Sequence, residues 1–226
     1  MTCTAPAYTA DQVRAAEKPL LEAGEPLMRW AASALARVIA DELVGRPHPR
    51  VLVLAGRGDN GADALYAAQR LVESGMDVDT LLTSGDAHVA ALAAAMSAGV
   101  RRIEADGLDA TAYDLVVDGI VGLGARGPLR GAARATVSAM RGADIPPVVA
   151  VDLPSGLHPD EGSADDAVLP AAVTVTFGAV KRGVGVAAGP GVVGRIVLVD
   201  LGLDLPDGLD LVEVERVVDG RAAQRE

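Results

Sequence analysis

The chain has 226 residues, which suits one α/β domain and is long enough for a sizeable core. Half of the residues are hydrophobic but only 2% are aromatic, so Ala, Val and Leu must build that core. The net charge of −11, with no basic cluster, argues against a nucleic-acid or anionic-membrane partner. An anionic small molecule stays open, because surface charge is screened beyond about 8–10 Å.

The composition also restricts the cellular setting and the metal chemistry. Cys3 is the only cysteine, which excludes a disulfide framework or a cysteine zinc site within one chain. Residues 1–10 have neither a basic region nor an apolar run, so we expect no signal peptide. The longest apolar runs are as short as strands, and none could span a bilayer. We therefore expect a cytoplasmic protein.

Two helices are expected before the first strand. Thr9 and Gln12 form a capping box that predicts a helix over residues 10–22, which Pro19 should kink or shorten. Apolar residues then recur at three- and four-residue spacing and predict an amphipathic helix over 26–44, ended by Gly45.

Strands and helices alternate through the rest of the chain. Strands are expected at 50–55, 78–83, 100–103, 115–118, 148–152, 173–177 and 196–199, with a further short one near 184–187. Helices are expected at 61–74, at 87–98 with Asp86 as N-cap, and at 128–140 with Pro128 at its first position. This order predicts a Rossmann-like three-layer αβα sandwich with a mostly parallel sheet. We expect one domain over 1–226, with a core at about 8–203 and a C-terminal segment, 206–226, whose end is loose.

The segment from Val51 to Asp63 holds the most informative motif. A short apolar strand leads into Gly56, Gly58 and Gly61, which satisfy the G-x-G-x-x-G spacing, and a helix follows. Such a turn cradles phosphate groups at a helix N-terminus. Two carboxylates, Asp59 and Asp63, however, stand where an anion should bind. For Asp63, a role at the helix dipole is as plausible as a functional one.

Two other strand ends also carry polar groups. Asp118 precedes a second glycine loop at 122–127, and Asp152 precedes Ser155. In doubly wound sheets, ligands bind beyond the carboxyl ends of the strands. An NAD-dependent dehydrogenase is disfavoured, because no acidic residue ends the strand at 78–83.

Oxygen ligands from these strand ends favour a hard cation. Asn60, Asp118 and Ser155 would supply an amide, a carboxylate and a hydroxyl oxygen. Zinc is not expected, because the chain has no cysteine pair and no closely spaced histidine pair.

Four motifs resemble one family. The sequence from Val51 to Leu65 resembles the "AGxGNNGGDGL" signature of the NAD(P)H-hydrate epimerases, the YjeF amino-terminal family. The stretches at 117–124, 151–157 and 174–181 resemble its other motifs, and their order holds from Tyr8 to Leu203. The chain departs from the pattern at Asp59 and Ala62, where the family has Asn and Gly, and at Leu123 and Val180.

The resemblance implies an isomerase that interconverts the R and S forms of hydrated NADH and NADPH (NADHX and NADPHX). It also implies one potassium ion per subunit, held by Asn60, Asp118 and Ser155. The matching substrate-binding residues are Asp59, Asn60, Gly61, Ala62, Asp63, Gly122, Leu123, Gly124, Ala125, Arg126, Gly127, Pro128 and Asp152.

The chemistry needs an acid or base at the reacting carbon, and we assign that role to Asp152. Lys181 and Arg126 are candidates for the substrate phosphates, although solvated surface charges are equally plausible, and His158 is expected to be a loop residue. A non-catalytic nucleotide-sensing or protein-binding scaffold remains an alternative, as does the epimerase half of a bifunctional epimerase/dehydratase. A homodimer and a separate ADP- or ATP-dependent dehydratase as pathway partner are further expectations.

Overall fold

The computed structural model describes residues 2–125, 127–141, 144–208 and 210–223. Its strands are β1 (Cys3–Tyr8), β2 (Arg50–Ala55), β3 (Asp77–Leu82), β4 (Arg101–Ile103), β5 (Leu115–Gly119), β6 (Val148–Val151), β7 (Val173–Phe177), β8 (Val180–Lys181), β9 (Arg195–Asp200), β10 (Asp210–Val214) and β11 (Arg216–Asp219). Its helices are α1 (Ala10–Glu22), α2 (Leu27–Glu42), α3 (Asp59–Glu73), α4 (Val89–Ala98), α5 (Gly131–Arg141), α6 (Gly189–Val192) and α7 (Gly220–Ala223), with short 3-10 turns η1 (Ala110–Ala112) and η2 (Arg182–Val184).

The main sheet has the strand order β11-β9-β7-β6-β5-β2-β3-β4 within the described residues. Each neighbouring pair in it is parallel. Its central strands are buried on both faces, as β2 shows with Val51 to Ala55 fully buried. That is why the apolar runs in the sequence are continuous rather than alternating.

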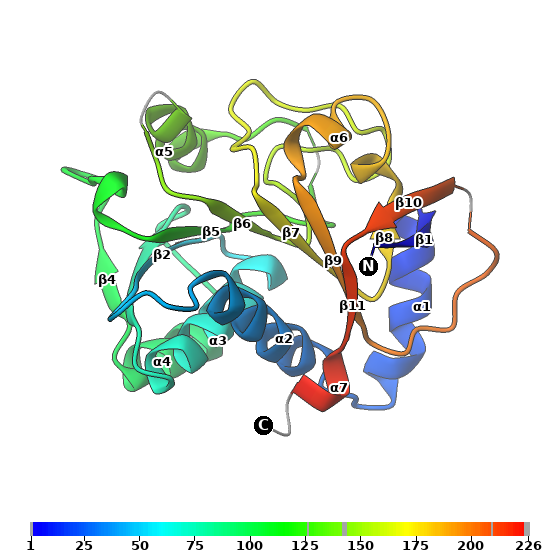
Figure 1. The fold of residues 1–226 in the computed structure, drawn as a ribbon, viewed down its shortest axis with the longest axis horizontal. Helices are drawn as coiled ribbons and strands as arrows, with labels where there is room; N and C mark the ends of the chain where they lie inside the picture. The colour runs from blue at the N-terminus through cyan, green and yellow to red at the C-terminus, as the bar shows by residue number, and fades with distance from the viewer. Residues whose placement is uncertain (1, 126, 142–143, 209, 224–226) are drawn as a thin grey trace.

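Helices cover both faces of this sheet (Figure 1). Helices α2, α3 and α4 lie against one face and share a core of Ala, Leu and Val with it. Helix α5 lies against the other face, over Leu52, Leu54 and Val116. The predicted three-layer αβα sandwich with a parallel sheet is confirmed.

A second, smaller sheet was not expected from the sequence. It has the order β10-β1-β8, with β1 antiparallel to β10 and parallel to β8. Figure 1 shows it beside α1, at the end of the molecule away from β4. In the segment at 206–226, β10 joins this sheet and β11 extends the main one, and the expected loose end stays a prediction. Its last three residues lie outside the described part.

Local differences from the predicted elements have simple causes. Helix α4 begins two residues later than expected, and its N-cap is His88, whose ring nitrogen accepts from the N–H of Ala91. Asp86 is therefore not the cap. Helix α5 begins at Gly131, so Pro128 stands before it rather than at its first position. Residues 184–187 form no strand: Val184 ends η2, and the chain turns over residues 185–187.

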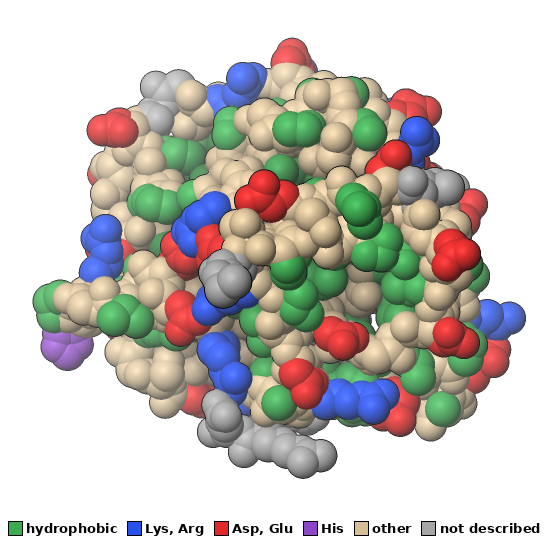
Figure 2. Space-filling model, turned by 45° about the vertical axis from the view of Figure 1, so that its right-hand side comes forward, with side chains coloured by type: hydrophobic (Ala, Val, Ile, Leu, Met, Phe, Trp, Pro, Cys, Tyr) green, Lys and Arg blue, Asp and Glu red, His purple; other side chains and the backbone are tan. Residues whose placement is uncertain are grey.

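The surface is mixed in charge. On the face in Figure 2, acidic and basic side chains alternate over most of the molecule. In the described part of the chain, no helix is long and apolar enough to cross a membrane.

Candidate active site

The site lies where the direction of strand order reverses. From β2 the chain adds β3 and β4 on one side and then returns to add β5, β6 and β7 on the other. The loops after β2 and β5 therefore flank a topological switch point, the usual place for a ligand crevice in such sheets.

The first glycine loop is shaped by close backbone approach. A Cβ atom at Gly56 would lie 1.9 Å from the carbonyl oxygen of Ile120, and one at Gly61 would lie 1.9 Å from that of Gly56. Both glycines thus let the loop, β5 and the start of α3 pack together. The close packing of this backbone requires glycine at both positions. That the loop also cradles phosphate stays a prediction.

Asp118 and Ser155 form a buried pair at the ends of β5 and β6. The Ser155 N–H donates to one oxygen of Asp118 at 2.8 Å, and its hydroxyl donates to the other at 2.6 Å. Ser155 Oγ also accepts from the N–H of Val121 at 3.0 Å. Both residues are fully buried. Burial raises the pKa of Asp118, and the hydrogen bonds from Ser155 offset only part of this effect.

Asp152 follows β6 and is paired with Lys181. The Lys181 ammonium donates to Asp152 Oδ1 and, at 2.7 Å, to the carbonyl oxygen of Phe177. Thr176 Oγ1 and the N–H of Phe177 also donate to Oδ1, while the N–H of Leu123 donates to Oδ2 at 3.0 Å. The Lys181 side chain is 2% exposed and that of Asp152 8%. A lysine so deeply buried is not the solvated surface charge that the sequence left possible.

The second glycine loop passes close to the side chains of Asn60 and Asp152. A Cβ atom at Gly122 would lie 2.5 Å from Asn60 Oδ1 and 2.9 Å from Asp152 Oδ2. Only a glycine can therefore bring this backbone between the first loop and Asp152. The amide nitrogen of Asn60 is buried and has no hydrogen-bond partner within the described part of the chain.

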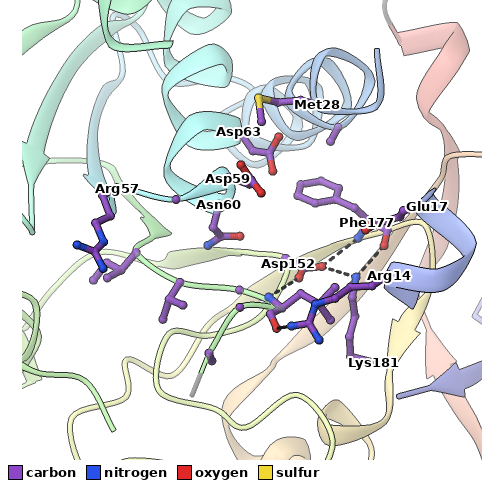
Figure 3. Close-up of a pocket in the computed structure, with 18 of the residues that line it drawn as sticks. Arg14, Glu17, Met28, Arg57, Asp59, Asn60, Asp63, Asp152, Phe177 and Lys181 are labelled. Atoms are coloured by element: carbon purple, nitrogen blue, oxygen red, sulfur yellow. Dashed lines mark hydrogen bonds and ion pairs between the residues drawn. The ribbon is translucent and has the colours of Figure 1, made fainter. Parts of the chain in front are cut away.

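Asn60, Asp152, Lys181 and the two glycine loops line one cavity of about 740 Å³, whereas Asp118 and Ser155 are buried behind it (Figure 3). Of the predicted substrate-binding residues, those that line it are Asp59, Asn60, Asp63, Gly122, Leu123, Gly124, Ala125, Gly127, Pro128, Asp152 and Lys181. Gly61 faces the Gly56 backbone, and Ala62 is fully buried in the core beneath α3. The methyl group of Ala62 therefore points away from the cavity. Arg126 lies outside the described residues.

Two carboxyl groups of the cavity have raised pKa values. Burial raises the pKa of Asp63 well above its ordinary value, and the negative charge of Asp152 adds to this. Asp63 Oδ1 has no hydrogen-bond partner among the described residues. Burial also raises the pKa of Glu17, and the nearby Lys181 ammonium offsets part of that rise.

Helix α1 supplies site residues that the sequence reasoning missed. Arg14, Glu17 and Leu21 line the cavity, and Arg14 donates to the carbonyl oxygen of Leu123 at 2.6 Å. Their spacing of three and four residues marks one helix face, which was available as a signal. Nothing in the sequence, however, showed that this face closes the cavity. His158 is a loop residue, as expected, and its Nδ1 accepts from the backbone N–H groups of Asp160 and Glu161.

Comparison with known proteins agrees with the motifs. Residues 24–183 match the family model described as YjeF-related protein N-terminus. An NAD(P)H-hydrate epimerase of Microbacterium testaceum is 54% identical over 88% of this chain and 79% of its own length. One from Clavibacter michiganensis is 46% identical over 92% of this chain and 96% of its own.

Two further matches are a bifunctional enzyme and a solved structure. The bifunctional NAD(P)H-hydrate repair enzyme Nnr of Mycobacterium tuberculosis is 44% identical over 88% of this chain and 42% of its own length. The crystal structure of yeast ynu0 has a TM-score of 0.72 at 21% identity, covering 79% of this chain and 83% of that one, and so shares the fold. On the family model and the two epimerase relatives together, the chain belongs to the family of YjeF-related protein N-termini.

Proposed function

We propose that the chain is an NAD(P)H-hydrate epimerase, an isomerase that interconverts the R and S forms of NADHX and NADPHX. The observation that carries this proposal is the buried Asp152–Lys181 pair at the floor of a cavity framed by both glycine loops. The 46–54% identity to relatives named NAD(P)H-hydrate epimerase supports it.

The substrate carries a hydroxyl group on the carbon next to the ring nitrogen. Inversion requires that this hydroxyl leave as water, which gives a cationic iminium, and that water then add to the opposite face. A negative charge held next to the ring stabilises that cation. Asp152 is the group best placed for this, because four donors orient its carboxylate and the cavity opens beside it.

A potassium ion fits the residues that the resemblance assigns to it. Asp118 is a fully buried carboxylate whose charge meets no ion pair in the described part of the chain. Ser155 Oγ lies beside it, and the side chain of Asn60 lies at the adjoining loop. This all-oxygen set suits a hard cation. Bound there, the ion would supply positive charge near the two glycine loops and would offset the carboxylates of Asp59 and Asp63, which line the cavity.

The remaining assignments follow from the same site. The two glycine loops would hold the nucleotide, and Lys181 would act through Asp152 rather than on the phosphates directly, because its ammonium is already bonded to protein oxygens. A cytoplasmic location, a homodimer and a separate dehydratase that consumes the S form stay part of the proposal.

The direct test uses proton NMR of a mixture of R and S hydrate together with an S-specific dehydratase. The protein should speed consumption of the R form relative to a sample without it. Binding of the hydrate with no acceleration would instead support the nucleotide-sensing scaffold.

For Asp152→Asn we expect kcat to fall by about 10²- to 10⁴-fold, the usual contribution of an acid–base group. The amide keeps the shape of the side chain and removes the charge that stabilises the iminium. Unchanged epimerisation of purified R hydrate would refute the assignment of Asp152. Asp160→Asn offers a control, because Asp160 caps the first turn of α1 and is not in the cavity.

For the ion we expect faster epimerisation in potassium chloride than in choline chloride of equal ionic strength. Asp118→Asn should remove that difference, because it removes the only charged ligand. If the wild-type rate is the same in both salts, the potassium assignment is wrong.

A further inference from the structure

The Asp152 carboxylate leaves one part of the chemistry without a group to perform it. Oδ1 already accepts from three donors and Oδ2 from one. Both oxygens of Asp152 therefore accept hydrogen bonds from the protein, and this side chain presents no donor to the substrate. Expulsion of the hydroxyl needs a proton donor that is ready before the bond breaks.

Glu17 of α1 is the carboxyl group placed to meet that need. It lines the cavity, and Figure 3 shows it extending from α1 toward Phe177, Asp152 and Lys181, while Asp59 and Asp63 enter from α3. In the described part of the chain no ion pair binds its carboxyl group; the neighbouring Arg14 is bonded to Asp11 and to the Leu123 carbonyl. It is half-buried, so its proton can be replaced from solvent after each turnover.

Asp63 does not fit the role equally well. Its side chain is nearly sealed, with 9% of the residue exposed, at the start of α3 beside the first glycine loop. Asp59 is exposed at the mouth of the cavity. Of the carboxyl groups that line the cavity, Glu17 alone is half-buried: it is more shielded than Asp59 and more open to solvent than Asp63 and Asp152.

We propose that Glu17 is a second catalytic residue: its carboxyl group protonates the departing hydroxyl group, while Asp152 takes the proton of the water that adds. This inference rests on the proposed epimerase function and adds a residue to it.

The reaction begins with proton transfer from Glu17 to the hydroxyl group. The C–O bond breaks, the oxygen leaves as water with the Glu17 proton, and the ring nitrogen lone pair forms the C=N⁺ bond. Water then forms a new C–O bond on the other face and gives a proton to Asp152, while the nitrogen regains its lone pair. The reverse reaction uses the two carboxyl groups in exchanged roles.

The burial of Glu17 and the charges around it raise its pKa on balance, which is the direction that a proton donor needs. Burial raises its pKa; Asp152 at the end of β6 and Asp59 on α3 act in the same direction, while Lys181 of β8 and Arg14 of α1 oppose them. Asp63 on α3 faces the same cavity. Activity that needs protonated Glu17 should decline as the pH rises through this raised pKa.

The test compares Glu17→Gln with Glu22→Gln, an exposed carboxyl on the same helix, in the full chain. For purified R hydrate we expect Glu17→Gln to lower kcat by about 10²- to 10³-fold with KM within about twofold. The alkaline decline in kcat/KM should disappear, and Glu17→Asp should recover part of the rate. Glu22→Gln should behave as wild type.

Each other outcome rejects the proposal. A Glu17→Gln rate within threefold of wild type, a change in KM alone, or an unchanged pH profile would each show that Glu17 does not donate the proton. Circular dichroism and the melting temperature establish that the variant is folded, and Glu17→Ala, which also removes the carboxyl group, repeats the test if it is not. Failure of the wild-type protein to epimerise would refute the proposed function itself, and that result is separate from any difference between the variants.

Discussion

The backbone of Asp152 has φ of 66°, a conformation that few residues other than glycine adopt. Such a conformation costs of the order of 1–3 kcal/mol and is kept where the surroundings hold it in place. Here the surroundings are the N–H of Leu123, the N–H of Phe177 and the Lys181 ammonium, which fix the side chain from different loops. The strain thus aims one carboxylate into the cavity rather than along the strand.

Gly122 allows a matched pair of substitutions. An alanine Cβ at Gly122 would lie 2.5 Å from Asn60 Oδ1 and 2.9 Å from Asp152, so the second loop must move out of the cavity. We expect Gly122→Ala to lower kcat/KM at least about tenfold, since misplacing a reacting group by 1 Å can cost far more. At Gly124, two residues away, an added Cβ meets nothing within 4 Å, so Gly124→Ala should be close to wild type. Equal activity of the two variants in the NMR assay would contradict this packing argument.

For the residues of the site, the sequence could predict which of them lie together but not how they interact. Asp118, Asp152 and Ser155 follow buried strands, and parallel strands end at one edge, so their proximity could be expected. The pairing of Asp152 with Lys181 could not be expected, because Lys181 comes from a two-residue strand whose position depends on pairing with β1. Nor could the orientation of Ala62, because one residue along a helix turns a side chain by about 100°.

Helix α1 stands apart from the helices that cover the main sheet. Only Ala10 and Val13 of this helix are buried, and its N-terminus is capped from another loop by Asp160 at 2.6 Å. Arg14 connects it to the second glycine loop through the Leu123 carbonyl. Helix α1 and that loop are thus joined across the mouth of the cavity.

Loss of this connection should weaken substrate binding. For Arg14→Gln we expect KM to rise about 3- to 10-fold, the effect of losing roughly 1 kcal/mol from one hydrogen bond to a charged donor that orders the loop. Lys18→Gln is the matched control, because Lys18 lies one turn further along the same helix and is 73% exposed. A KM for Arg14→Gln that equals that of Lys18→Gln would show that the loop does not need α1.

The helices and strands of the main sheet could be predicted well because their patterns are local. Three predicted elements, α1, β2 and β7, have the observed bounds, since a capping box begins α1 and a glycine directly follows β2 and β7. β1 and β10 could not be found this way: Pro6 interrupts the first, and charged residues interrupt the second. Both exist because they pair with each other.

For the molecule as a whole, two groups of carboxyls should act on stability in opposite directions. Burial raises the pKa of Asp63, Glu17 and Asp118, so their ionisation opposes folding. Stability should therefore rise as the pH falls from above these raised values toward about 4, the unfolded pKa. Burial also acts to raise the pKa of Asp79, but hydrogen bonds from Arg101 and Tyr113 outweigh it, and the net pKa is lowered. The stability from Asp79 is present above about pH 4 and is lost below it.

The free energy of unfolding in urea should consequently be larger near pH 5 than at pH 8, and should fall again below pH 4. Asp63→Asn should raise the stability at pH 8 by about 0.5–2 kcal/mol, the usual gain when a site costly to the fold is neutralised, and should flatten the alkaline side of the curve. Asp59→Asn, on the exposed face of the same turn, should change the curve less than Asp63→Asn, because Asp59 contributes only part of the charge that raises the pKa of Asp63. A wild-type stability that declines steadily from pH 8 to pH 5 would contradict the raised pKa values.

The small sheet sets the order in which the molecule can be completed during synthesis. β1 is made before both of its neighbours, since β8 begins at residue 180 and β10 ends at residue 214. Its backbone N–H and C=O groups therefore stay paired with water until those strands have emerged. Because β1 holds both β8, with Lys181, and the start of α1, a nascent chain can form the parallel sheet and the glycine loops before the cavity has its last wall. A ribosome-stalled chain ending near residue 205 would therefore carry Asp152 and Lys181 but lack β10, one of the two strands that pair with β1.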